Sequence, residues 1–105
     1  MLKFDEQNRN RSVEIKMGRR IEISLPENPT TGFRWQAVQL GEPVVELIEK
    51  HFVPGLKATG ETGLQVWKFK VTAEGAATIQ LVYRRSWESD AAAANIFSLQ
   101  VRGKR

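Results

Sequence analysis

Apolar and polar side chains alternate with a period of two along most of this chain. Ile21, Ile23 and Leu25 are separated by Glu22 and Ser24. The same pattern recurs in segments 13–17, 33–37, 67–71, 79–83 and 97–101. Successive side chains of a strand point to opposite faces, so the pattern predicts strands with one buried and one solvated face. Segment 44–53 is apolar but less regular, which predicts a strand with a kink or bulge.

Segments rich in glycine and proline separate these strands at short intervals. About seven or eight short antiparallel strands in 105 residues predict an all-β, immunoglobulin-like β-sandwich, with Trp35 as its core tryptophan. The alanines at 91–94 favour a helix of at most one turn, with Ser89 or Asp90 as its N-cap. There is no repeat or linker, so we expect a single domain over residues 1–105.

Composition and charge exclude several classes of protein. The chain has no cysteine, so it has no disulfide and no thiolate nucleophile or metal ligand. No apolar run reaches the roughly 18 residues of a membrane span, and we expect no membrane partner. The opening residues lack the apolar segment of a signal peptide, which predicts a cytoplasmic protein as written, or a periplasmic or secreted one if a signal was removed. The net charge is +4, but basic and acidic residues are interleaved, so we expect no nucleic-acid partner.

The residue types that carry catalysis do not form a recognisable site. The single histidine, His51, lies in a predicted strand without a serine–aspartate partner pattern. Thr30 and Thr31 have no neighbouring base that would activate a hydroxyl. The acidic residues lack the spacing of calcium or magnesium ligands. We therefore expect no catalytic residue, no metal and no cofactor, and a binding protein rather than an enzyme.

Residues 28–33, Asn-Pro-Thr-Thr-Gly-Phe, are the most constrained segment of the chain. Asn28 can accept hydrogen bonds from the following amides in an Asx-turn, and Pro29 fixes its own φ near −65°. Gly32 permits a positive φ. The two threonines between them are stiff and carry hydroxyls. The segment therefore predicts a rigid turn with two hydroxyls, which is either a plain tight turn or a recognition wedge.

Two further connections are longer or less regular than a hairpin needs. Segment 54–63 is rich in glycine, and segment 84–89 contains Trp87 between Arg85 and Glu88. Because alternate connections of a sandwich lie at the same end, we expect these two segments beside residues 28–33. An exposed tryptophan next to arginine is typical of interface hot spots. The sequence alone is equally compatible with a core or edge position for Trp87.

Three motifs together resemble one known family. Asn-Pro-Thr-Thr-Gly-Phe-Arg-Trp at 28–35, Gly-x-x-Gly at 60–63 and Arg-x-Trp at 85–87 are similar, in order and spacing, to the chagasin family. Members of that family inhibit papain-like cysteine proteases, including cathepsin L-like enzymes and their parasite or bacterial relatives. The resemblance covers nearly the whole chain. It implies an immunoglobulin-like fold with the three loops side by side, and a monomer is the form that we expect.

The resemblance also implies a role for each loop in a reversible, competitive inhibitor that occludes the protease cleft. Residue 30 would lie nearest the catalytic cysteine, segment 60–63 would pair with the enzyme's backbone along the non-primed subsites, and residue 87 would cover the primed side. The protease-binding residues would be Asn28, Pro29, Thr30, Thr31, Gly32, Phe33, Gly60, Glu61, Thr62, Gly63, Arg85, Ser86 and Trp87.

Two residues depart from the family pattern. Thr62 stands where the family usually has glycine, and Ser86 where it usually has proline. We expect both to tune potency or target choice rather than to remove the function. The alternative hypotheses are a β-sandwich adhesion module, binding carbohydrate or another ligand through the same loops, and a nucleic-acid-binding domain.

Overall fold

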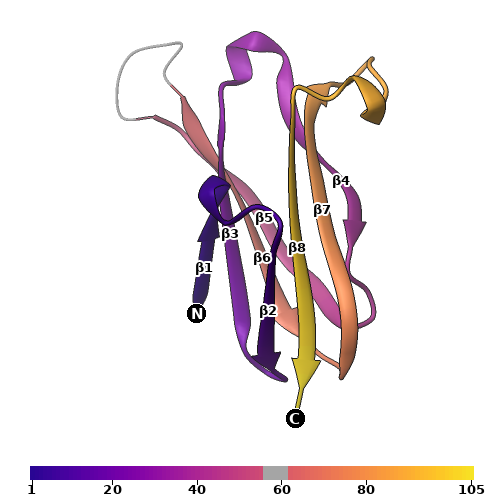
Figure 1. Cartoon of the computed structure of the whole chain (residues 1–105). Coiled ribbons are helices and arrows are strands. Elements are labelled where there is room, and N and C mark those ends of the chain that lie inside the picture. The colour runs from indigo at the N-terminus through magenta and orange to yellow at the C-terminus, as the bar shows by residue number, and fades with distance from the viewer. Residues whose placement is uncertain (56–61) are drawn as a thin grey trace.

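The computed structural model describes residues 1–55 and 62–105, which form two four-stranded sheets packed face to face (Figure 1). Sheet A has, in spatial order, β1 (Leu2–Asp5), β3 (Arg20–Glu27), β6 (Gly63–Val71) and β5 (Val45–Val53). Sheet B has β2 (Arg11–Lys16), β8 (Asn95–Lys104), β7 (Gly75–Arg85) and β4 (Phe33–Leu40). Short 3₁₀ turns are η1 (Glu6–Asn8), η2 (Pro29–Thr31) and η3 (Asp90–Ala92). None of the helical segments in these ranges is long and apolar enough to cross a membrane.

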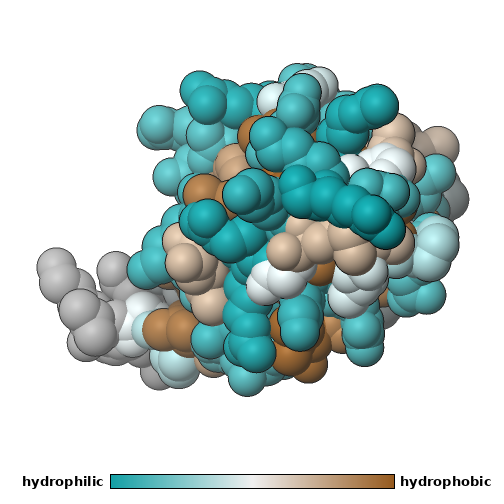
Figure 2. Space-filling model, turned by 90° about the horizontal axis from the view of Figure 1, so that it is seen from below, coloured by the Kyte–Doolittle hydropathy of each residue, from teal (hydrophilic) through white to brown (hydrophobic). Residues whose placement is uncertain are grey.

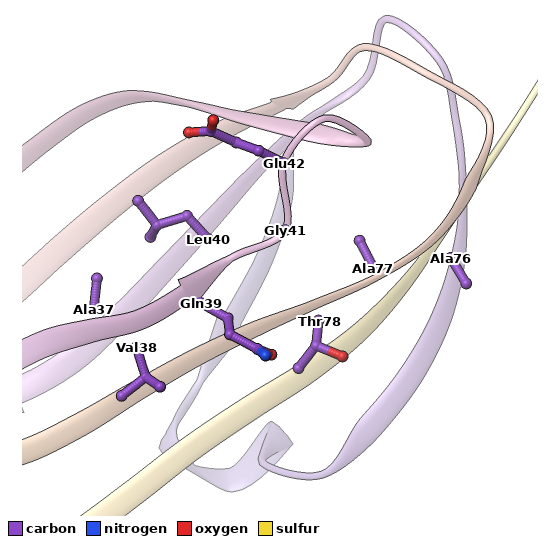
Figure 3. Close-up of a pocket in the computed structure, with 9 residues that line it drawn as sticks. All are labelled: Ala37, Val38, Gln39, Leu40, Gly41, Glu42, Ala76, Ala77 and Thr78. Carbon is purple, nitrogen blue, oxygen red and sulfur yellow. The ribbon is translucent and has the colours of Figure 1, made fainter. Parts of the chain in front are cut away.

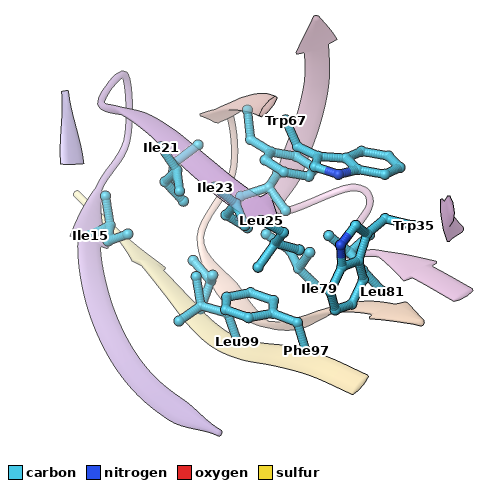
Figure 4. Close-up of a cluster of buried hydrophobic side chains, with 14 residues drawn as sticks. Ile15, Ile21, Ile23, Leu25, Trp35, Trp67, Ile79, Leu81, Phe97 and Leu99 are labelled. Carbon is cyan, nitrogen blue, oxygen red and sulfur yellow. The ribbon is translucent and has the colours of Figure 1, made fainter. Parts of the chain in front are cut away.

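The inward positions of the alternating segments fill the space between the sheets (Figure 4). The three apolar residues of β3 are completely buried, and Trp35 is buried as expected for the core tryptophan. Burial of this apolar surface is the main favourable contribution to folding. The labelled residues of the cluster come from both sheets: Ile15, Ile21, Ile23, Leu25, Trp35, Trp67, Ile79, Leu81, Phe97 and Leu99.

The predicted all-β sandwich is confirmed, but the prediction that its strands are antiparallel is wrong for two pairings. β1 lies parallel to β3, and β2 lies parallel to β8. The N-terminal segment forms an edge strand of one sheet and then, after η1, an edge strand of the other. Strand β1 was not predicted, although Leu2 and Phe4 pack against the core. Alternation could not reveal the parallel pairings, because side chains alternate in the same way in both kinds of ladder.

The irregular segment 44–53 contains the predicted bulge. The pairing of β5 with β6 shifts between Leu47 and Glu49, which leaves Ile48 as the extra residue. A second shift, which was not predicted, lies in β4 between Ala37 and Gln39. The predicted single helical turn is present as η3, but it covers Asp90–Ala92 rather than residues 91–94, and its N-cap residue Ser89 makes no capping hydrogen bond through its side chain.

Candidate functional site

Strand pairing places the connection after β3 between two other segments of the chain. Glu27, the last residue of β3, is paired with Gly63 at the start of β6. Phe33, the first residue of β4, is paired with Arg85 at the end of β7. We call residues 28–33 the central loop and residues 85–89 the tryptophan loop. Figure 1 shows both at the same end of the sandwich.

Of the glycine-rich segment 54–63, the structure describes residues 54, 55, 62 and 63. Gly63 is buried next to the base of the central loop, and Thr62 is exposed beside it. The predicted site residues Gly60 and Glu61 lie outside the described residues. The structure therefore brings the central loop, the tryptophan loop and the beginning of β6 together.

The central loop is closed by hydrogen bonds among its own residues. Asn28 Oδ1 accepts from the backbone nitrogen of Thr30 at 3.1 Å and from its hydroxyl at 2.6 Å. The Thr31 hydroxyl donates to the Asn28 carbonyl at 2.8 Å and accepts from the backbone nitrogen of Phe33 at 3.2 Å. Both hydroxyl protons are therefore used inside the loop. The Thr30 hydroxyl is exposed, and its oxygen can still accept a hydrogen bond from a binding partner.

The backbone of the central loop has the conformation that its residue types predict. Pro29 begins the 3₁₀ turn η2, where its missing N–H and fixed φ are compatible with a helical start. Gly32 ends the turn with a φ of 81°, in the left-handed region that favours glycine. The predicted Asx-turn and positive φ are both confirmed. The segment is therefore a coiled turn rather than an extended peptide.

The two ends of the central loop are joined at its base by Trp35. The backbone nitrogen of Trp35 donates to Glu27 Oε1 at 2.8 Å, and its indole nitrogen donates to the Pro26 carbonyl at 2.9 Å. Glu27 is only 3% exposed, so this bond lies in a region of low dielectric, where it is stronger than in water. Glu27 was not among the residues predicted for the site, although the inward register of β3 continues to this position.

Tyr83 connects the central loop to the core. Its hydroxyl accepts a hydrogen bond from the backbone nitrogen of Asn28 at 3.2 Å. The Tyr83 ring packs against the ring of Trp35, with centroids 5.0 Å apart, and against that of Phe33 at 5.4 Å. Tyr83 was predicted to lie in a strand but was not among the predicted site residues. These contacts hold the central loop against β7.

Trp87 is exposed and lies beside the central loop. Trp87 is 73% exposed, so the core position that the sequence also allowed is wrong. A β-carbon added to Gly32 would lie 3.6 Å from the Trp87 ring. The Arg85 guanidinium lies over the Phe33 ring at 4.6 Å and over the Trp87 ring at 5.9 Å. Arg85 therefore contacts aromatic rings of both loops.

Side chains also hold the backbone of the tryptophan loop. Arg84 Nε donates to Asp90 Oδ1 at 2.8 Å, and Arg84 Nη1 donates to the carbonyls of Arg85 at 3.1 Å and Ser86 at 3.3 Å. Glu88 Oε1 accepts from the backbone nitrogen of Arg85 at 3.3 Å. Arg84 therefore links the carbonyls of this loop to the first residue of η3.

Away from these loops, the described residues include one histidine and a shallow hollow, and they form no metal-binding group. His51 lies on β5 with its Nδ1 2.6 Å from Glu49 Oε2. Among the described residues, no group of three histidine or acidic side chains could hold a metal ion. A shallow hollow of about 650 Å³ lies between the end of β4 and the start of β7, where Ala76, Ala77 and Thr78 form one wall (Figure 3). The end of the sandwich opposite the loops is covered mostly by hydrophilic residues (Figure 2).

The described part of the chain is thus a β-sandwich that presents exposed loops at one end, and the central loop among them is internally hydrogen-bonded. The family model of the chagasin family peptidase inhibitor I42 matches residues 14–101. The chain therefore belongs to the chagasin family, whose members are protease inhibitors and not enzymes.

Comparisons with individual proteins agree with this assignment. Chagasin from Trypanosoma cruzi is 30% identical over 90 residues, which cover 81% of this chain and 82% of chagasin. The crystal structure of the cysteine protease inhibitor EhICP2 from Entamoeba histolytica has a TM-score of 0.88 at 21% identity, covering 98% of this chain and 95% of that one. PbICP-C, solved in complex with falcipain-2, has a TM-score of 0.68 at 16% identity, covering 99% of this chain and 100% of that one. The predicted immunoglobulin-like fold is confirmed by these structures.

Proposed function

We propose that this protein is a reversible, competitive inhibitor of papain-like cysteine proteases that occludes the active-site cleft with residues 28–33, 60–63 and 85–87. Membership of the chagasin family supports the inhibitory role. The complex of PbICP-C with falcipain-2, a papain-like cysteine protease, supports the class of target. The observation that carries the proposal is the central loop, which is exposed at its tip, internally hydrogen-bonded and held on the core by Tyr83.

The central loop has properties suited to a cleft that cuts peptides. Proteases hold the segment that they cleave in an extended conformation, whereas residues 29–31 are coiled into a 3₁₀ turn. The loop would therefore fill the cleft without offering a peptide bond in productive register. The active cysteine of these enzymes is a thiolate paired with a protonated histidine. The Thr30 hydroxyl donates its own hydrogen bond to Asn28 Oδ1. Its oxygen would therefore accept a hydrogen bond from the imidazolium of the protease.

The flanking segments would extend the contact on both sides of the cleft. Trp87 would cover the primed side, where an exposed, flat aromatic side chain can act as an anchor. Residues 60–63, of which only Thr62 and Gly63 are described, would pair with the enzyme's backbone along the non-primed side. Loops that are already ordered lose little conformational entropy on binding. This is how an interface of ordinary size can bind tightly.

The test is an inhibition assay of papain and cathepsin L with a fluorogenic peptide substrate, with trypsin as the control enzyme. We expect the apparent KM to rise without a change in the maximal rate, and activity to return on dilution. Trypsin should stay fully active. Full activity of both cysteine proteases at micromolar concentrations of this protein would contradict the proposal. A fall in the maximal rate at unchanged KM would contradict the competitive mechanism.

A further inference from the structure

Basic side chains gather at the end of the sandwich opposite the central loop. Strands β2, β6 and β8 end there, and the turn 17–19 joins β2 to the start of β3 (Figure 1). The backbone nitrogen of Met17 donates to the Lys104 carbonyl at 2.7 Å, and that of Val71 donates to the Arg19 carbonyl at 2.9 Å. The turn is therefore held between the ends of β8 and β6. It brings together five exposed residues that we call the basic strip: Lys16, Arg19, Arg20, Lys70 and Lys104.

The strand register places like charges side by side within the basic strip. Arg20 is the Cα partner of Lys70, and Lys16 is the Cα partner of Lys104. Like charges at directly opposed positions destabilise a sheet. The outer faces also contain cross-strand pairs of opposite sign, which are Lys3 with Glu22, Glu22 with Lys68, Glu46 with Lys70, and Glu14 with Arg102. The two like-charged pairs thus cost stability at one end of a surface that otherwise alternates in sign.

Most of the charge of the basic strip has no partner in the described part of the chain. Within residues 1–55 and 62–105, Lys104 lies 3.5 Å from Glu14, and the other four side chains of the strip form no hydrogen bond or ion pair. A like-charged pair near the loops differs in this respect. Arg34 and Arg84 are also Cα partners, but Arg84 is bound to Asp90 at 2.8 Å. The basic strip therefore keeps a local excess of positive charge that an external anion can neutralise.

We propose that the basic strip binds a linear sulfated polysaccharide at the end of the molecule away from the inhibitory loops. This site goes beyond protease inhibition and does not depend on it. Neighbouring strands lie about 4.8 Å apart, so the strip is a row of cations that runs from sheet B across the turn to sheet A. A chain with sulfate groups on successive sugars follows this row. Each cation that it neutralises releases counterions, and each arginine offers two parallel N–H groups to an oxyanion.

Other polyanions match the basic strip less well. A single-stranded nucleic acid gains much of its affinity by stacking bases on aromatic side chains, and neither the strip nor the turn contains an aromatic residue. An anionic membrane favours a broad basic surface from which apolar side chains insert. Here Glu14 and Glu74 are also exposed near this end, and Met17 is the single apolar side chain of the turn. A flexible chain that follows a narrow row avoids these carboxylates.

The experiment measures binding of fluorescently labelled heparin by anisotropy at about 0.15 M salt. The test variant is Arg19→Gln/Arg20→Gln, and the matched control is Arg11→Gln/Arg34→Gln. Each removes two exposed positive charges from the net +4, but the control residues lie outside the strip. We expect the test variant to raise the dissociation constant at least about tenfold and to lower the slope of log affinity against log salt by about one to two. The control should change the constant by less than about threefold.

Two results of this titration would overturn the proposal. One is the absence of heparin binding by the wild-type protein, and the other is an equal loss of affinity in both double variants, which would indicate a general charge effect. Denaturant unfolding should show that Arg19→Gln/Arg20→Gln is at least as stable as the wild type, because it removes the repulsion between Arg20 and Lys70. Weaker binding by a variant of unchanged stability assigns the loss to the strip.

Backbone amide NMR of the wild-type protein locates the site directly. On addition of heparin, we expect the signals of residues 16–20, 70 and 104 to shift while those of residues 28–33 and 85–87 stay in place. Shifts confined to the loops would contradict a site at the opposite end. Competition with oligothymidine and with phosphatidylserine vesicles tests the class of partner. If either displaced heparin at a lower concentration of negative charge than unlabelled heparin does, the assignment to a polysaccharide would be wrong.

Discussion

The hydroxyl of Tyr83 accepts a hydrogen bond from the backbone nitrogen of Asn28 at 3.2 Å, between residues 55 positions apart in the sequence. Asn28 follows β3 in sheet A, whereas Tyr83 belongs to β7 in sheet B. The first residue of the central loop is therefore held by a strand of the opposite sheet. The orientation of the central loop depends on the packing of the sandwich as well as on its own sequence.

Replacing Tyr83 with phenylalanine tests this relationship. The Tyr83→Phe variant keeps the ring contacts with Phe33 and Trp35 but removes the acceptor for Asn28. We expect the free energy of unfolding to fall by about 0.5–1.5 kcal/mol and the inhibition constant to rise several-fold. Denaturant unfolding and the papain assay measure the two effects.

A matched control for Tyr83→Phe is Thr78→Val. It removes a hydroxyl that donates to Gln100 on the outer face of sheet B. This variant should leave inhibition unchanged. If Tyr83→Phe also left the inhibition constant unchanged, its hydrogen bond would not position the loop.

The buried carboxylate at the base of the central loop should contribute mainly to stability. In Glu27→Ala the buried backbone nitrogen of Trp35 loses its acceptor, which costs about 1–3 kcal/mol of unfolding free energy. Glu27→Gln keeps a carbonyl oxygen at this place and should lose less. Urea unfolding of both variants provides the comparison. Equal stability of Glu27→Ala and wild type would show that the hydrogen bond contributes nothing net.

Trp87 should matter for binding and not for folding. Because Trp87 is 73% exposed, Trp87→Ala should change the unfolding free energy by less than about 0.5 kcal/mol. Aromatic anchors often contribute about 2 kcal/mol or more to an interface, so the inhibition constant should rise at least about tenfold. The control is Ile48→Ala, which truncates an exposed apolar residue at the bulge of β5. Equal inhibition by Trp87→Ala and wild type would remove Trp87 from the interface.

Gly32 provides a test of the backbone conformation of the central loop. An alanine at this position adopts the left-handed region at a cost of about 1–2 kcal/mol, while its β-carbon makes only an ordinary contact with Trp87. Gly18→Ala is the matched control, since Gly18 has a φ of 89° in the turn between β2 and β3 and open space around it. Both variants should lose similar stability in denaturant unfolding. Only Gly32→Ala should weaken inhibition. Equal inhibition constants for Gly32→Ala and Gly18→Ala would contradict the assignment of the central loop to the protease interface.

Sequence patterns predicted the sandwich because the signal for each strand is local. Alternation marks which residues face the core, and β3 follows it from Ile21 to Glu27. Strand β1 was missed because only two apolar residues, Leu2 and Phe4, represent it in a polar N-terminal segment. Its parallel pairing is a relation between distant segments, and alternation carries no information about direction.

The same distinction explains what was predicted of the candidate site. Asn28, Pro29 and Gly32 determine the shape of the central loop through their own backbones, so that shape could be predicted. The supporting roles of Glu27 and Tyr83 arise from contacts made only after the strands are paired. The exposure of Trp87 also depends on tertiary packing. The consequence of threonine at position 62 remains a prediction.

The most direct test of the central claim is protection of the catalytic cysteine in the target. Papain is treated with a thiol-alkylating reagent in the presence of increasing amounts of this protein, and the rate of cysteine modification is followed by mass spectrometry. If the loops occlude the cleft, the rate of modification should fall in proportion to the fraction of enzyme bound, and Trp87→Ala should shift the protection to higher concentrations. Unchanged alkylation of an enzyme that is fully bound would contradict occlusion of the active site.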